Sequence, residues 1–240
     1  MSGLRALLFD PLRTLFFPPH CAGCGHAIPD GEVLCATCQS GIEKIRPPRC
    51  EVCSQPYPGD LPVFTCPNCH GDPFHFENAI AVVRSRGIVR EMIHRLKYNK
   101  ELWLGRILAD WMHEGLSDSR LRHWTPEALV PVPLHPRRLR EREFNQAEIL
   151  CRELSRLSGI PVKSALARRR YTTTQTLLDR RGRRQNLRDA FIPVKNGDVT
   201  NMNLLLVDDV LTTGSTLDAC AATLLESGAA SVRALTAARG

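Results

Sequence analysis

The spacing of apolar residues after position 76 predicts strands and helices in alternation. Short apolar runs predict strands at 79–83, 128–132, 204–207 and 231–237. Apolar residues at intervals of three and four predict helices at 86–98, 102–116, 140–157 and 215–227. Strands that alternate with helices favour a parallel sheet covered on both faces, so the expected fold class is α/β.

The first 76 residues have a different composition. Residues 1–17 form an apolar segment interrupted by charged residues and proline, without a small-residue cleavage site, which argues against a signal peptide. Residues 18–76 are rich in Pro, Gly and Cys, and residues 77–240 carry the α/β pattern. No apolar run approaches the ~20 residues that span a bilayer, so no transmembrane segment is expected.

Eight of the 10 cysteines fall into four C-x-x-C pairs. The pairs are Cys21/Cys24, Cys35/Cys38, Cys50/Cys53 and Cys66/Cys69. Each pair lets two thiolates converge on one metal ion, and two pairs complete a four-cysteine site of the structural zinc type. The pairs predict two zinc ribbons in tandem, with a cross-braced pairing as the alternative.

A redox motif or a disulfide framework would also use paired cysteines. Four pairs of identical spacing, in a chain without an export signal, instead favour a reducing compartment and zinc. We therefore expect a cytoplasmic protein with two structural zinc ions. Cys151 and Cys220 lie in helical patterns and are expected to be buried as small apolar residues.

The run from Leu204 to Leu217 carries the strongest chemical signal. Its strand places Asp208 and Asp209 at the carboxyl edge of a sheet, where open α/β folds bind ligands. A loop of small residues then offers backbone N–H groups and hydroxyls to a phosphate at a helix N-terminus. The loop residues are Thr212, Thr213, Gly214, Ser215 and Thr216. An ordinary capped turn would explain the loop but not the two acids.

The basic balance of the chain points to anionic partners. The formal net charge is +7 and the pI is about 9.0, which favours nucleic acid or phosphorylated metabolites. Arg137 and Arg138 follow the strand at 128–132, and a second arginine cluster follows Arg168. Arginine suits phosphate because its planar fork donates two parallel hydrogen bonds. For any single arginine, an ordinary solvated surface is the alternative.

The run through Val207 to Thr216 resembles the ribose 5-phosphate-binding motif of type I phosphoribosyltransferases. The resemblance implies that Asp208 and Asp209 hold the ribose hydroxyls of phosphoribosyl pyrophosphate (PRPP). It also implies that the loop holds the 5′-phosphate and that Mg²⁺ accompanies PRPP. By the same analogy, Arg137 or Arg138 assists the release of pyrophosphate.

The whole chain resembles the ComF family of competence-associated proteins, with a zinc-ribbon front end and the Asp-Asp motif. Arg142 to Ala147 matches that family's Arg-Gly-Phe-Asn-Gln signature, with Glu143 where glycine is usual. Lys97 and Tyr98 match its Leu-Lys-Tyr segment. A further Gln…Leu…Arg-x-x-Asn pattern is matched, when one residue of drift is allowed, by Gln175, Leu178, Arg184, Asn186 and Phe191, with Arg183 as the better-spaced arginine.

This resemblance implies a PRPP-binding, phosphoribosyltransferase-like protein of natural competence. It would handle single-stranded DNA at the cytoplasmic side of the inner membrane, beside DNA-uptake or helicase proteins. An aromatic content of 6% argues against a long stacking platform, so DNA binding is expected to be mainly electrostatic. One alternative is an active phosphoribosyltransferase with an acceptor that the sequence does not name. Another is a zinc-stabilised interaction module whose transferase site has decayed.

Overall fold

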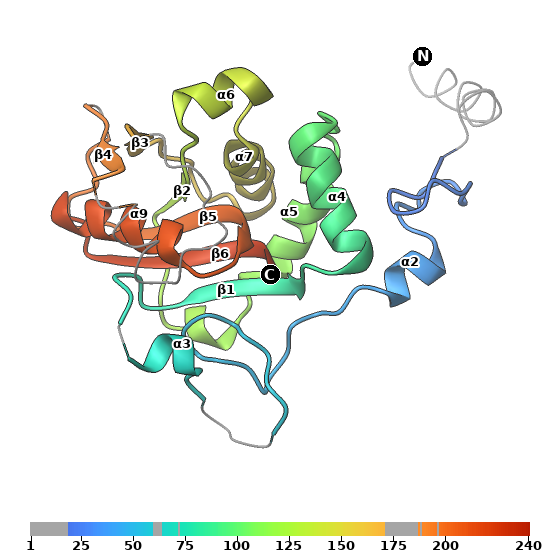
Figure 1. Cartoon of the computed structure of the whole chain (residues 1–240), viewed down its shortest axis with the longest axis horizontal. Coiled ribbons are helices and arrows are strands. Elements are labelled where there is room, and N and C mark those ends of the chain that lie inside the picture. The colour runs from blue at the N-terminus through green and yellow to red at the C-terminus, as the bar shows by residue number, and fades with distance from the viewer. Residues whose placement is uncertain (1–18, 60–63, 72, 171–186, 188, 196) are drawn as a thin grey trace, which may run out of the picture.

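The computed structural model describes residues 19–59, 64–71, 73–170, 187, 189–195 and 197–240 (Figure 1). The Cys-rich region contains two short helices, α2 (Ala36–Ser40) and α3 (Pro67–His70). The helices of the α/β region are α4 (Gly87–Tyr98), α5 (Leu104–Gly115), α6 (Pro136–Arg142), α7 (Gln146–Ser158) and α9 (Ser215–Glu226), with a 3₁₀ helix η1 (Ser119–Leu121). The strands are β1 (Ala79–Arg84), β2 (Ala128–Pro131), β3 (Leu166–Arg168), β4 (Phe191–Pro193), β5 (Asn203–Leu211) and β6 (Ser231–Arg239).

Four strands form a parallel sheet in the order β1-β6-β5-β2. This confirms the parallel α/β prediction. β5 pairs with β6 as far as Leu211 opposite Arg239, whereas β2 stops at Pro131 opposite Val207. The last four residues of β5 therefore extend beyond the end of β2, at the carboxyl edge of the sheet.

Helices cover both faces of the sheet (Figure 1). Leu205 and Val207 of β5 pack on the face covered by α4, α5 and α7. Leu204 and Leu206 pack on the opposite face, which α9 covers. α7, which follows β2 and α6, and α9, which follows β5, thus lie on opposite faces of the sheet. In open α/β sheets, ligands bind in the crevice between two such strands.

β5 is longer than the sequence predicted. A strand ending at Val207 is wrong, because hydrogen bonding to β6 continues to Leu211. Asp208 and Asp209 are therefore part of the strand and do not follow it. Successive side chains of a strand point to opposite faces. Asp208 accordingly lies on the α9 face and Asp209 on the face of α4 and α7.

The single helix predicted at 140–157 is also wrong, because α6 and α7 are separate helices. Glu143 ends α6 with a left-handed φ of 70°, which residues with a Cβ rarely adopt. Asn145 then caps α7, since its side chain accepts a hydrogen bond from the Ala147 N–H. The left-handed turn gives a physical reason for the glycine that is usual at position 143 in the matched signature.

Replacing Glu143 with glycine is expected to raise the free energy of unfolding by about 1 kcal/mol, because glycine adopts this turn without strain. The variant also loses the Lys100–Glu143 ion pair, at 2.6 Å, but this loss offsets little of the gain in stability because both side chains are exposed. Urea denaturation measures the difference. The control Glu143→Ala loses the ion pair but keeps the strain, so it should gain no stability. A glycine variant no more stable than this control would contradict the expectation.

The antiparallel pair β3–β4 was not predicted. Each strand has three residues, which is too short for an alternating pattern to stand out. The pair sets the Arg168 guanidinium over the ring of Phe191, 5.4 Å from its centroid. Most of the second basic cluster and the Gln175-to-Asn186 match lie outside the described residues, as does segment 1–17.

Within the ranges that the structure describes, no helix is long and apolar enough to span a membrane. Cys151 on α7 and Cys220 on α9 are both fully buried, as the sequence predicted. Neither of them belongs to the cysteine groups described below.

Candidate functional site

The paired cysteines gather into two groups of four. In each group the sulfur atoms all lie within 4.8 Å of one another. The groups are Cys21, Cys24, Cys35 and Cys38, and then Cys50, Cys53, Cys66 and Cys69. Sulfurs around a tetrahedral zinc ion lie about 3.8 Å apart, and the Cys24–Cys35 and Cys53–Cys66 sulfurs are 3.7 Å and 3.6 Å apart. These are two four-cysteine zinc-binding sites in tandem, and the cross-braced alternative is excluded.

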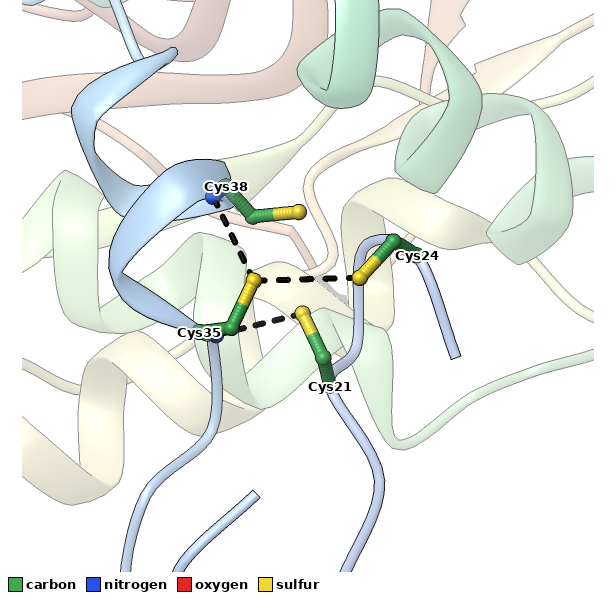
Figure 2. A group of neighbouring side chains, drawn as sticks. All are labelled: Cys21, Cys24, Cys35 and Cys38. Atoms are coloured by element: carbon green, nitrogen blue, oxygen red, sulfur yellow. Dashed lines mark hydrogen bonds between the residues drawn. The ribbon is translucent and has the colours of Figure 1, made fainter. Parts of the chain in front are cut away.

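The first zinc site joins a turn to the start of α2 (Figure 2). The backbone N–H of Cys35 donates to the Cys21 sulfur at 3.2 Å, and that of Cys38 donates to the Cys35 sulfur at 3.4 Å. Such donors stabilise the thiolate form that binds zinc. Arg95 of α4 donates to the Ala22 carbonyl at 2.6 Å, which ties this ribbon to the α/β region.

The second zinc site is built into the core. Its four cysteines are all buried and belong to the apolar cluster that contains Phe76 and Ala79, at the start of β1. The Ser54 hydroxyl, which is fully buried, donates to the Ala79 carbonyl at 2.8 Å and accepts from the Ala81 N–H at 3.1 Å. The second ribbon is therefore hydrogen-bonded to β1, which is an edge strand of the four-stranded sheet.

A buried ionic cluster fastens the second ribbon to the segment after α5. Asp118 pairs with Arg49 of the ribbon at 2.8 Å and with Arg120 at 3.0 Å. Arg120 also donates to the Glu51 carbonyl at 3.1 Å and to the Ser54 hydroxyl at 3.0 Å. Burial opposes ionisation of Asp118, but the hydrogen bonds and charge of Arg120, together with Arg49, hold its pKa below the usual value.

Asp209 on β5 is buried and held from two helices. Its carboxylate forms an ion pair with Lys97 of α4 and accepts a hydrogen bond from the Gln146 amide of α7 at 3.2 Å. Arg142 in turn donates to the Gln146 carbonyl oxygen at 2.6 Å. Burial opposes the charge on Asp209, but Lys97 outweighs burial and keeps the pKa of this carboxyl below its usual value.

Asp208 has the opposite electrostatic character. Its side chain lies on the other face of β5, and burial, followed by the charge of Asp209, raises its pKa well above the usual value. Arg168 of β3 is close enough that the charge of Asp208 acts on its pKa, although burial is the larger effect there and lowers it. Asp209 is thus an ionised carboxylate that Lys97 holds in place. The ionised form of Asp208 would be stabilised by a cationic or hydroxyl-bearing ligand.

The predicted phosphate loop connects β5 to α9. Gly214 has a φ of 82° and is the N-cap of α9, where it has no side chain to cap the helix, although the Ser215 N–H donates to the Thr213 hydroxyl at 3.5 Å. The first-turn N–H groups of this 12-residue helix therefore face the loop, with the positive end of the helix dipole behind them. The Thr213 and Ser215 hydroxyls lie 3.1 Å apart beside these groups. The arrangement fits a phosphate.

The segment that leaves the second ribbon supports this loop. Phe74 and Phe76 stack with ring centroids 4.4 Å apart, and a Cβ on Gly214 would lie 2.9 Å from the Phe74 ring. Asp218, in the first turn of α9, accepts hydrogen bonds from the His75 N–H at 2.7 Å and from His75 Nδ1 at 2.9 Å. A glycine is therefore required at position 214 for two reasons, its φ and the adjacent ring.

Arg137 and Arg138 lie in the first turn of α6, which follows β2 at the same edge of the sheet. The backbone continues past β2 beside β5, because the Val132 N–H donates to the Val207 carbonyl at 3.0 Å. Both arginine side chains are near Glu141, at 3.1 Å and 3.8 Å respectively. The structure thus brings all the predicted site residues of the α/β region to the carboxyl edges of two neighbouring strands.

Three side chains of this site were not assigned a role from the sequence, namely Lys97, Gln146 and Arg142. They come from α4, α7 and the end of α6, far from β5 in the sequence. Their only signal was membership in the matched Lys-Tyr and Arg-x-Phe-Asn-Gln segments. No spacing rule connects those segments to Asp209, so only the fold reveals the contact.

Two family models match the chain, a double zinc ribbon domain over residues 12–71 and a phosphoribosyl transferase domain over residues 145–240. The fold and the two sites thus define a zinc-ribbon protein with a phosphoribosyltransferase-like domain. Among whole proteins, Competence protein F of Haemophilus influenzae is 33% identical over 205 residues, which cover 83% of this chain and 86% of that protein. The chain belongs to the ComF family of competence-associated proteins.

Two further relatives extend over a similar length. DNA utilization protein YhgH of Escherichia coli is 32% identical over 208 residues, covering 83% of this chain and 87% of that protein. Competence protein ComFC of Bacillus subtilis is 28% identical over 213 residues, covering 85% and 83%. The similarity to all three therefore extends over more than four fifths of this chain.

Proposed function

We propose that this protein binds Mg²⁺–PRPP at the carboxyl end of β5 and handles single-stranded DNA during uptake. One observation carries the PRPP proposal. The same strand end presents two carboxylates whose pKa values shift in opposite directions, Asp208 and Asp209, and leads through a short loop to a helix N-terminus whose N-cap is Gly214. A sugar phosphate with vicinal hydroxyls needs hydrogen-bond acceptors for its hydroxyls and donors for its phosphate close together.

Each part of the crevice has a distinct task in this proposal. The N–H groups and hydroxyls of the loop from Thr212 to Thr216 hold the 5′-phosphate. Asp208 and Asp209 accept hydrogen bonds from the ribose hydroxyls, with Asp209 kept in place by Lys97. Arg137 and Arg138 contact the pyrophosphate group. Mg²⁺, which enters with PRPP, neutralises charge on the pyrophosphate.

The DNA part of the proposal rests on the relatives and on charge. Two relatives are named competence proteins and one is named a DNA utilization protein. A net charge of +7 favours a phosphate backbone as partner and predicts binding that weakens with salt. We place this activity at the cytoplasmic side of the inner membrane, with DNA-uptake or helicase proteins as partners.

Catalytic transfer of ribose 5-phosphate is the second candidate function. The match to the phosphoribosyl transferase domain and the presence of both acids and the loop support it. In that case the Asp208 and Asp209 carboxylates would also stabilise positive charge developing at C1 of the ribose. Release of pyrophosphate from PRPP on addition of an acceptor separates this candidate from binding alone.

Isothermal titration calorimetry with Mg²⁺–PRPP tests the binding proposal. We expect wild-type protein to bind and the double variant Asp208→Asn/Asp209→Asn, which keeps side-chain size, to lose binding. The matched control Glu153→Gln changes a partly exposed acid of α7 that pairs with Arg156, and it should bind as wild type does. Absence of binding by wild type, or equal binding by the double variant, would overturn the proposal.

A further inference from the structure

Tyr98, at the end of α4, and Trp103, just before α5, are two exposed aromatic side chains near one junction of the chain. Tyr98 is 58% exposed and Trp103 is 51% exposed, with the exposed Leu102 between them in the chain. In the part of the chain that the structure describes, no other Phe, Tyr or Trp side chain is exposed to this extent. Large aromatic surfaces left in water often mark an interaction site.

An arginine lies over each of the two rings. The Arg142 guanidinium lies 5.2 Å from the Tyr98 ring centroid, and that of Arg95 lies 5.9 Å from the Trp103 ring. Both arginines are anchored elsewhere, Arg142 by Gln146 and Arg95 by Glu101 and the first zinc ribbon. The rings are therefore held in place before any partner arrives, which lowers the entropy lost on binding.

The surroundings of the two rings are basic. Residues 86–106 contain six Lys or Arg and two Glu. Arg86, Arg90 and Arg106 are exposed and lie outside the ion pairs described above, whereas Glu101 is neutralised by Arg95 at 2.5 Å. The neighbouring Glu143 is likewise neutralised by Lys100, at 2.6 Å. His94 packs against Tyr98 with ring centroids 4.7 Å apart and is itself exposed. Anionic, ring-containing partners fit such a surface better than acidic or aliphatic ones.

We propose that Tyr98 and Trp103 form a stacking site for the bases of single-stranded DNA, with the surrounding cations binding its phosphates. Unpaired bases stack on aromatic rings regardless of sequence, whereas the bases of a duplex are already stacked on each other. Such a site does not need a long row of aromatic residues, because two rings with basic neighbours are enough to hold two bases. This adds base stacking to the mainly electrostatic binding that the sequence predicts.

The stacking site lies beside the PRPP crevice. Lys97 pairs with Asp209 at the carboxyl end of β5, where we place PRPP, while the next residue, Tyr98, faces solvent. One helix end therefore contributes to both sites. The proposal rests on the DNA-handling part of the proposed function and specifies its contact surface, but it does not depend on PRPP binding.

Fluorescence anisotropy with a labelled oligo-dT of about 16 nucleotides tests the stacking site. The full-length zinc-loaded protein is compared with Tyr98→Leu, Trp103→Leu and the ring-conserving Tyr98→Phe and Trp103→Phe. We expect each Leu variant to bind about five- to a hundredfold more weakly and each Phe variant to stay close to wild type. Zinc content and the unfolding midpoint confirm that each variant is folded.

A duplex of the same length is the matched ligand control, and its affinity should not change in the Leu variants. Oligo-dT binding that is equal in wild type and folded Leu variants would overturn the stacking site while leaving DNA binding intact. No binding of oligo-dT by wild type would overturn both the stacking site and the DNA part of the proposed function. Calorimetry with Mg²⁺–PRPP reports on the crevice independently.

Discussion

Replacing Asp118 with alanine is expected to destabilise the protein by about 3–5 kcal/mol, because a buried ion cluster loses its only carboxylate. The Arg49, Asp118 and Arg120 side chains are all less than 10% exposed. Without Asp118, two guanidinium groups would remain buried close together, and the charge of Arg120 already disfavours the charge on Arg49. Urea denaturation monitored by circular dichroism measures this loss.

The structural consequence extends to the second zinc ribbon. Asp118 orients Arg120, and Arg120 holds the ribbon through the Glu51 carbonyl and the Ser54 hydroxyl. The matched control Glu43→Ala removes a carboxylate from an exposed ion pair with Arg84, at 3.1 Å, and is expected to cost less than about 1 kcal/mol. Equal losses for the two variants would contradict the role assigned to the buried cluster.

The stabilisation by Asp118 also depends on pH. Its pKa is lower in the folded protein than the value of about 3.9 expected for an unfolded chain. The contribution is therefore fully present above the unfolded pKa and is lost as the pH falls through the folded pKa. The stability difference between wild type and Asp118→Ala should accordingly stay constant near neutral pH and shrink below about pH 4.

Replacing Lys97 with methionine is expected to cost about 3 kcal/mol of stability and at least about tenfold in affinity for Mg²⁺–PRPP. The Asp209 side chain is 4% exposed, so its carboxylate would remain buried without a cation. Relaxation of Asp209 would also remove the fixed acceptor that we assign to the ribose. Calorimetry and urea denaturation of the same variant measure the two effects.

A double variant separates the two effects of Lys97. In Lys97→Met/Asp209→Asn, the buried charge is gone and the new amide on β5 can still bond to Gln146, so most of the stability should return. PRPP affinity should stay low because the carboxylate is absent. A double variant that regains affinity together with stability would show that Asp209 acts only through folding.

The sequence predicted the metal chemistry well because it is local. A C-x-x-C turn brings two thiolates together whatever the rest of the fold does, so spacing was enough to predict two zinc sites. The parallel sheet was also predictable, since buried strands and amphipathic helices leave separate periodic patterns. The loop to which we assign the phosphate could be proposed from the sequence because its residues are contiguous, from Thr212 to Thr216.

Features that depend on long-range contacts were beyond the sequence. The length of β5 is set by its hydrogen bonds to β6, and the break at Glu143 by a backbone angle that no local pattern of this chain indicates. The clamp of Lys97 on Asp209 joins residues more than a hundred positions apart. The stacking site is likewise visible only once the exposure of Tyr98 and Trp103 is known.

Hydrogen–deuterium exchange with and without Mg²⁺–PRPP is the most direct test of where the ligand binds. We expect slower exchange at the N–H groups of Thr212 to Thr216 and the first turn of α9, because a bound phosphate would accept hydrogen bonds from them. The first zinc ribbon serves as an internal control and should not change. Unaltered exchange in this loop at saturating PRPP, or protection confined to other segments, would contradict the account.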